Sequence, residues 1–200
     1  MTMIRKEIRP AIVLTLLICL ITGFLYPGVV TVLAQLLFPS QANGSIVLVE
    51  GKPVGSRLLG QPFTAPYYFH PRPSAAGSGY DASASSGTNK GPTDLKLADT
   101  LIAGAVTEVV ANDGAEKGRI PSDMVTASAS GLDPDISPAN AALQVARVAR
   151  ERKADPKAVQ ALVDRYTEGR QFGFLGDPRV NVLMLNLAVD SAFPRPPGKH

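Results

Sequence analysis

Cysteine and histidine are scarce in this sequence. Cys19 is the single cysteine among 200 residues, and it lies inside an apolar run. The rest of the chain therefore cannot form a disulfide or a thiolate metal site. The two histidines are His70 and His200, and His200 is the final residue of the sequence. A serine or cysteine hydrolase would thus be expected to use His70.

Recognisable catalytic and nucleotide motifs are also missing. No G-x-S-x-G or S-x-x-K motif accompanies His70, which lies between Phe69 and Pro71, so we expect a loop histidine. The glycine-rich stretch 77–91 lacks a G-x-x-x-x-G-K-[ST] motif and a preceding strand, which argues against a phosphate-binding loop. Asp133-Pro134-Asp135 lacks the spacing of a calcium loop. We therefore expect no active site, no metal site and no directly bound cofactor.

Charge is absent from a long stretch near the N-terminus. No charged residue occurs between Arg9 and Glu50, and residues 11–38 form an apolar run of about 28 residues, enough to cross a hydrocarbon core of ~30 Å. Pro27-Gly28 predicts a kink within one span. A cleaved signal peptide, with its site at residues 32–34, is the alternative, but the apolar run continues past that site.

Basic residues precede the span and set its expected orientation. Arg5, Lys6 and Arg9 outweigh Glu7 there, while the other basic and acidic residues nearly cancel. The sequence pI of 9.1 therefore does not indicate a nucleic-acid partner. By the positive-inside rule we expect a cytoplasmic N-terminus over 1–10, a transmembrane helix over 11–38 and an extracytoplasmic domain over 39–200, in the inner (plasma) membrane.

The outer part combines strand and helix patterns, which predicts an α+β domain. Residues 45–61 are typical of a hairpin with its turn at Glu50-Gly51, and 62–92 of a long loop. Apolar residues at helical spacing predict an amphipathic helix over 97–112 packed on a core. Ser137-Pro138, Asp155-Pro156 and Asp177-Pro178 resemble helix starts, although 180–189 could be strand or helix, with helix weakly favoured.

Two clusters in this domain are open to more than one interpretation. Basic residues on the helix after Ser137, at positions 147, 150, 152 and 153, are expected to form a solvated face. The long loop carries residue types that are enriched at buried interface centres, which makes them candidates for partner binding or, equally, for the domain's own core. These candidates are Tyr67, Tyr68, Phe69, His70 and Arg72.

Several longer motifs occur in a fixed order after the apolar anchor. They are GQPF at 60–63, YFHPRPS at 68–74, YD at 80–81, DMVTASASGLDP at 123–134, ISP at 136–138, TEGR at 167–170 and PRVNVL at 178–183. Together they resemble the C subunit of the Kdp-type potassium-transporting ATPase over nearly the whole chain.

The resemblance implies a small accessory subunit of a three-subunit complex. Its partners would be a P-type ATPase catalytic subunit and a potassium-channel-like subunit, which would handle ATP and potassium themselves. The family is also described as raising the ATP affinity of the catalytic subunit. The absence of a D-K-T-G-T phosphorylation sequence agrees with an accessory role. The alternative is a membrane-anchored or secreted envelope hydrolase that uses His70 and a serine.

Overall fold

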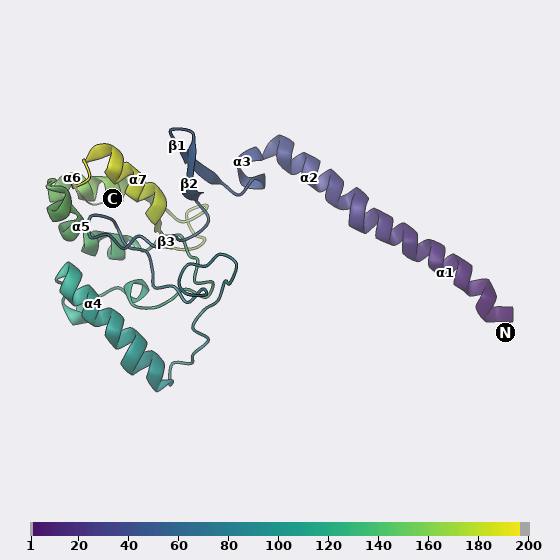
Figure 1. Ribbon diagram of the computed structural model, residues 1–200, viewed down its shortest axis with the longest axis horizontal. Coiled ribbons are helices and arrows are strands. Elements are labelled where there is room, and N and C mark those ends of the chain that lie inside the picture. The colour runs from purple at the N-terminus through teal and green to yellow at the C-terminus, as the bar shows by residue number, and fades with distance from the viewer. Residues whose placement is uncertain (1, 197–200) are drawn as a thin grey trace. The chain divides into compact units, whose positions relative to one another are not determined.

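A computed structural model describes residues 2–196 of the chain, with side chains from residue 6 onward. The chain divides into two compact units, one up to Ser56 and one from Arg57. The first unit is the helical anchor with a short hairpin, and the second contains all the remaining helices and strands (Figure 1). An α+β fold that follows one apolar helix confirms the predicted fold class.

The anchor is one continuous helical run in three segments. These are α1 (Thr2–Leu20), the π-helical turn η1 (Ile21–Leu25) and α2 (Tyr26–Leu37). Among residues 2–196, Lys6–Leu37 is the one helical stretch long and apolar enough to span a membrane. The turn η1 ends two residues before Pro27, which has no N–H to donate to the carbonyl of Gly23. Tyr26 N–H donates to Ile21 O, which is the i→i−5 bond of a π-helix. The π-helical turn near the proline thus does not divide the span.

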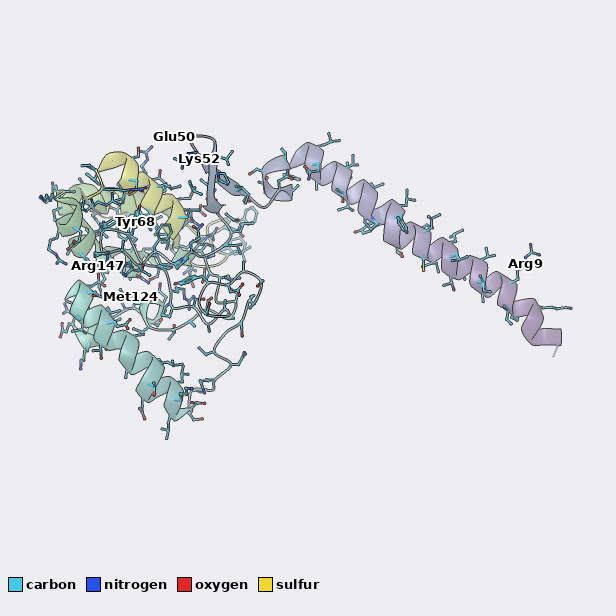
Figure 2. All side chains as sticks on the ribbon, viewed as in Figure 1. Arg9, Glu50, Lys52, Tyr68, Met124 and Arg147 are labelled. Atoms are coloured by element: carbon cyan, nitrogen blue, oxygen red, sulfur yellow. The ribbon has the colours of Figure 1, made fainter. Side chains whose placement is uncertain are left out.

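A hairpin follows the anchor, as the sequence predicts. The short helix α3 (Pro39–Ala42) leads to β1 (Ile46–Val49) and β2 (Lys52–Ser56), which pair antiparallel. Figure 2 labels Glu50 and Lys52 at its closed end. Glu50 and Gly51 both have positive φ, at 51° and 77°, which suits the tight turn between twisted strands.

Three helices and a small sheet build the core of the second unit. The helices are α5 (Pro138–Arg152), α6 (Pro156–Tyr166) and α7 (Val182–Ala192), and the antiparallel sheet has the order β3 (Asp135–Ile136), β5 (Arg179–Asn181), β4 (Thr167–Glu168). Their apolar side chains enclose Phe69 in one cluster. This cluster is the main hydrophobic core among the described residues.

Two of the three predicted helix starts are confirmed. Ser137 accepts a hydrogen bond from Asn140 N, and Asp155 accepts one from Lys157 N, each before a proline at the first helical position. The predicted start at Asp177 is wrong. Residues 179–181 form β5, and Asn181 caps α7 through Met184 N. The β-branched residues at the start of this segment thus form strand before the helix begins.

The helix predicted over 97–112 is present but is less buried than expected. It consists of the π-helical turn η2 (Lys96–Ile102) and α4 (Ala103–Asp113), followed by short 3-10 turns η3 (Lys117–Arg119) and η4 (Ser122–Met124). Val109 is its one buried side chain, and Leu101 is exposed. Its apolar stripe faces a groove shared with the loop residues Pro73, Val125 and Ala127. The expected packing on a closed core is therefore wrong for the first half of this helix.

The long loop 62–92 contains no helix or strand, as predicted. It is nevertheless fixed by close backbone contacts. Gly131, with φ of 66°, has Ser86 O and Ala76 N so close that a Cβ would lie 2.5 Å and 2.7 Å from them. The Tyr80 hydroxyl donates to Arg72 O at 2.5 Å, and burial raises the pKa of Tyr80 to about 12. The loop is thus an ordered part of the domain.

Candidate functional site

The aromatic segment 66–71 crosses the domain core between α5 and α7. Phe69 is 0% exposed and packs in the central cluster. Figure 2 labels Tyr68 and Arg147 within this region. A segment inside a core needs partners for its backbone N–H and C=O groups, and among residues 2–196 no strand is paired with this one. Side chains from the two helices supply them.

Two buried amides bond the segment as a neighbouring strand would. Asn186 on α7 accepts from Phe69 N at 2.8 Å and donates to Phe69 O at 2.9 Å. Gln144 on α5 does the same for the next residue, accepting from His70 N at 2.7 Å and donating to His70 O at 3.0 Å. Each amide thereby satisfies one donor and one acceptor of the main chain.

Arg147 on α5 completes the backbone contacts on the N-terminal side. Its Nη1 donates to Pro66 O at 2.5 Å and Tyr68 O at 2.8 Å. Its Nε forms an ion pair with Asp113 at 2.7 Å, and the two side chains are only 2% and 4% exposed. Asp113 is the last residue of α4, so this buried pair also ties the end of α4 to α5.

Arg152 at the end of α5 is buried as well. Its Nε donates to Tyr67 O at 2.9 Å, and its guanidinium lies 5.1 Å and 5.0 Å from the ring centroids of Tyr67 and Tyr68. Its Nη2 pairs with Asp190 on α7 at 2.6 Å. Burial would raise the pKa of Asp190, but hydrogen bonds from Arg195, Arg152 and Tyr68 outweigh it and lower that pKa. Asp190 therefore remains an anion opposite Arg152.

The structure places the five candidate residues in unequal surroundings. Tyr67 and Phe69 are buried within the domain, whereas Tyr68, His70 and Arg72 are partly exposed. Tyr68 donates from its hydroxyl to Asp190 at 2.9 Å, and burial together with that bond raises its pKa. Arg72 pairs with Asp133 at 3.0 Å. Four of the five lie together in the segment, and Arg72 turns toward a different part of the domain.

His70 has no serine among its partners in the described part of the chain. Its Nε2 lies 3.1 Å from Ala65 O and 3.5 Å from Arg147 Nη1. Nε2 must carry the proton to bond the carbonyl, so Arg147 adds only an unfavourable charge there. Burial, followed by the charge of Arg147, lowers the pKa of His70. This arrangement suits a neutral, structural histidine, and nothing found supports the hydrolase alternative.

Sequence reasoning missed the side chains that hold the segment. Arg147 and Arg152 were expected on a solvated helix face, and that expectation is wrong, since both are buried. A signal for Arg152 was available, because Ala141, Val145, Val148 and Arg152 follow one another at helical spacing on the buried face. Asn186 likewise stands four residues after Val182 and three before Val189, both buried.

The hairpin β1–β2 carries apolar side chains that the described structure leaves uncovered. Ile46, Leu48 and Val54 are 50%, 61% and 37% exposed. A two-stranded hairpin is marginally stable alone in water. Contiguous exposed apolar side chains commonly mark contact sites with another molecule. The hairpin is therefore a second candidate surface, and one that residue type alone did not indicate.

Comparison with known proteins gives the family. The model of the family described as KdpC, K+-transporting ATPase, c chain, matches residues 8–191. A potassium-transporting ATPase KdpC subunit from Gemmatimonas aurantiaca is 62% identical over 187 residues, which cover 93% of both chains. The KdpC subunit from Koribacter versatilis is 52% identical over 193 residues, covering 96% of this chain and 98% of the relative. The chain therefore belongs to the KdpC family of K+-transporting ATPase c chains, and it is an accessory subunit of the potassium uptake complex.

Proposed function

We propose that the chain is a non-catalytic, single-pass anchored subunit with a cytoplasmic N-terminus and its α+β domain outside the inner (plasma) membrane. The basic residues that precede the span support this orientation. The apolar helix Lys6–Leu37 has none of its residues buried, as expected for a helix covered by lipid or by partner helices. The test is a reporter that is active only in the cytoplasm. Fused after Lys199 it should be silent, and fused before Thr2 it should be active. Activity at Lys199 would reverse the orientation.

The partners we propose are the P-type ATPase catalytic subunit and the potassium-channel-like subunit of the complex. The exposed apolar side chains of the hairpin β1–β2 support this proposal, because a two-stranded hairpin is marginally stable alone and exposed apolar patches commonly mark contact sites. Leu48→Ser should lower co-purification of both partners with the full-length chain. Lys52→Ser, an exposed polar position on the same hairpin, is the matched control and should not. Equal co-purification of the two variants would contradict the assignment.

We propose the partly exposed candidates Tyr68, His70 and Arg72 as a second site of contact with a partner subunit. Arg72→Ala removes an ion pair that is itself partly exposed, so the domain should stay folded. A fall in complex yield or in transport with unchanged thermal unfolding would support partner binding at this residue. Unchanged yield and transport would exclude it.

We also propose that ATP and potassium are bound by the partner subunits, so that any effect of this chain on ATP affinity acts by linkage. Such coupling is typically about 1–3 kcal/mol. Lys90, in the glycine-rich stretch, is engaged by Asp94 at 2.8 Å. Lys90→Ala should leave the ATP affinity of the complex unchanged, whereas deleting the chain should lower assembly or activity. Photo-crosslinking of an ATP analogue to the outer domain in sealed vesicles would overturn both linkage and orientation.

A further inference from the structure

The connection between β4 and β5 projects an ordered apolar tip, residues 171–176. Phe172, Phe174 and Leu175 are 88%, 70% and 47% exposed. A phenylalanine side chain offers roughly 150–250 Å² of surface, so the two rings alone present about 300 Å². Apolar patches of this size on a protein surface are often functional.

Backbone hydrogen bonds hold the tip in one shape. Gln171 and Leu175 exchange both of their backbone bonds at 2.9 Å, and Phe174 N donates to Gln171 O at 3.2 Å. Arg170 and Asp177 close the base with an ion pair at 3.0 Å. The rings are therefore presented by a pre-organised turn, which lowers the entropy lost when a partner binds.

The turn contains a residue type that its conformation disfavours. Phe172 and Gly173 have φ of 52° and 82°, so both central residues of the turn are left-handed, as in a type I′ turn. Asn, Asp and Gly are the preferred residues at the first of these positions, whereas a bulky side chain is strained there. A phenylalanine that is both strained and exposed improves neither the stability nor the solubility of the domain. Binding of a partner through the ring would explain why it is there.

The base of the tip lies beside the residue at which the second unit begins. Arg57, its first residue, forms an ion pair with Glu168 of β4. Asn181 of β5 donates from Nδ2 to Arg57 O at 2.9 Å. The segment that joins the two units therefore enters this unit beside the strands that carry the tip.

The charges near the tip favour a protein over the bilayer surface as its binding partner. Arg170 is neutralised by Asp177, which is 87% exposed and would be repelled by anionic headgroups. The tip also lacks the Trp and Tyr that are enriched at membrane interfaces. Phenylalanine, by contrast, is enriched at buried centres of protein interfaces. We propose that the 171–176 tip docks the Phe172 and Phe174 rings into an apolar pocket on a membrane-embedded partner subunit of the same complex; this rests on the proposed function.

The sharpest test changes stability and binding in opposite directions. Phe172→Asn places the favoured Asn-Gly pair in the turn, so thermal unfolding of the full-length chain in detergent should occur at an equal or higher temperature. Its apparent Kd for the complex prepared without this chain should nevertheless rise about tenfold or more, as expected for loss of a central aromatic contact. Lys157→Asn, an exposed position on α6, is the control and should change neither quantity.

Photo-crosslinking identifies the occupant. A benzophenone amino acid at Phe172 in the assembled complex should link to a partner subunit, and the same group at Lys157 should not. Links to lipid alone, or an unchanged Kd for Phe172→Asn, would overturn the docking proposal. If the wild-type chain itself fails to bind the other subunits, the proposed function fails instead, so the two failures are distinguishable.

Discussion

Asn186→Leu isolates the contribution of the side-chain amides to the fold. The substitution keeps a side chain that branches at Cγ on α7 but removes the group that bonds both Phe69 N and Phe69 O. Asn186 is 1% exposed and Phe69 is 0% exposed, so water cannot replace the lost bonds without opening the core. Two backbone polar groups would be left buried without partners.

The expected cost follows from those two groups. Leaving a buried donor or acceptor unsatisfied costs about 1–3 kcal/mol, so the pair should lower the free energy of unfolding by about 2–6 kcal/mol. For a domain of this size, 1 kcal/mol changes Tm by about 2–4 °C, which predicts a decrease of about 4–24 °C. This loss is a large fraction of the stability of an ordinary domain.

Thermal unfolding of the full-length chain in detergent, followed by circular dichroism, measures the decrease. Amide hydrogen exchange at Phe69 should accelerate in parallel, because its acceptor is gone. Asn112→Leu, at an exposed position near the end of α4, is the matched control and should leave Tm nearly unchanged. If Asn186→Leu lowers Tm by no more than this control, the amide does not hold the segment and the description of the core is wrong.

Three further changes test other parts of the domain. Arg152→Met removes the hydrogen bonds that Arg152 donates to Asp190 and to two backbone carbonyls, so it should cost about 2–6 kcal/mol in urea unfolding, against under about 0.5 kcal/mol for the exposed Arg150→Met. Because the folded-state pKa of His70 is lowered, the unfolded state binds more protons, and stability should fall as pH drops below about 6.5. His70→Gln should flatten that part of the pH profile, and an unchanged slope would contradict the assignment. Gly131→Ala forces a Cβ onto backbone atoms and should unfold the domain at much lower urea than Gly114→Ala, which has a similar φ but open space around it.

Features fixed by neighbouring residues could be predicted from the sequence. The hairpin turn at Glu50-Gly51, the caps at Ser137 and Asp155, and the single apolar span all depend on a few adjacent side chains. The start of α7 was misplaced because two local signals competed. Pairing of residues 179–181 with β3 and β4 decided the outcome, and that pairing joins segments far apart in the chain.

The buried polar side chains could not be predicted in the same way. Arginine on a helix is usually solvated, and Arg147 departs from that rule because Asp113 and two loop carbonyls meet it in the interior. Nothing within the sequence of α5 indicates that a segment some 80 positions earlier requires donors there. Residue type therefore predicted the helix correctly but misassigned two of its polar positions.

The same reasoning bears on where partner contacts are sought. Aromatic residues and arginine are typical of interface centres, and both occur in the segment around Tyr67 and Phe69. The side chains of Tyr67 and Phe69, however, are buried in contacts within the domain. The 171–176 tip has a less distinctive composition, but its rings are exposed on a backbone that is already ordered. Composition identifies residues able to form an interface, and burial decides which of them are free to do so. Among the described residues, the apolar hairpin and the tip meet that criterion, which is why the proposed partner contacts are assigned to them.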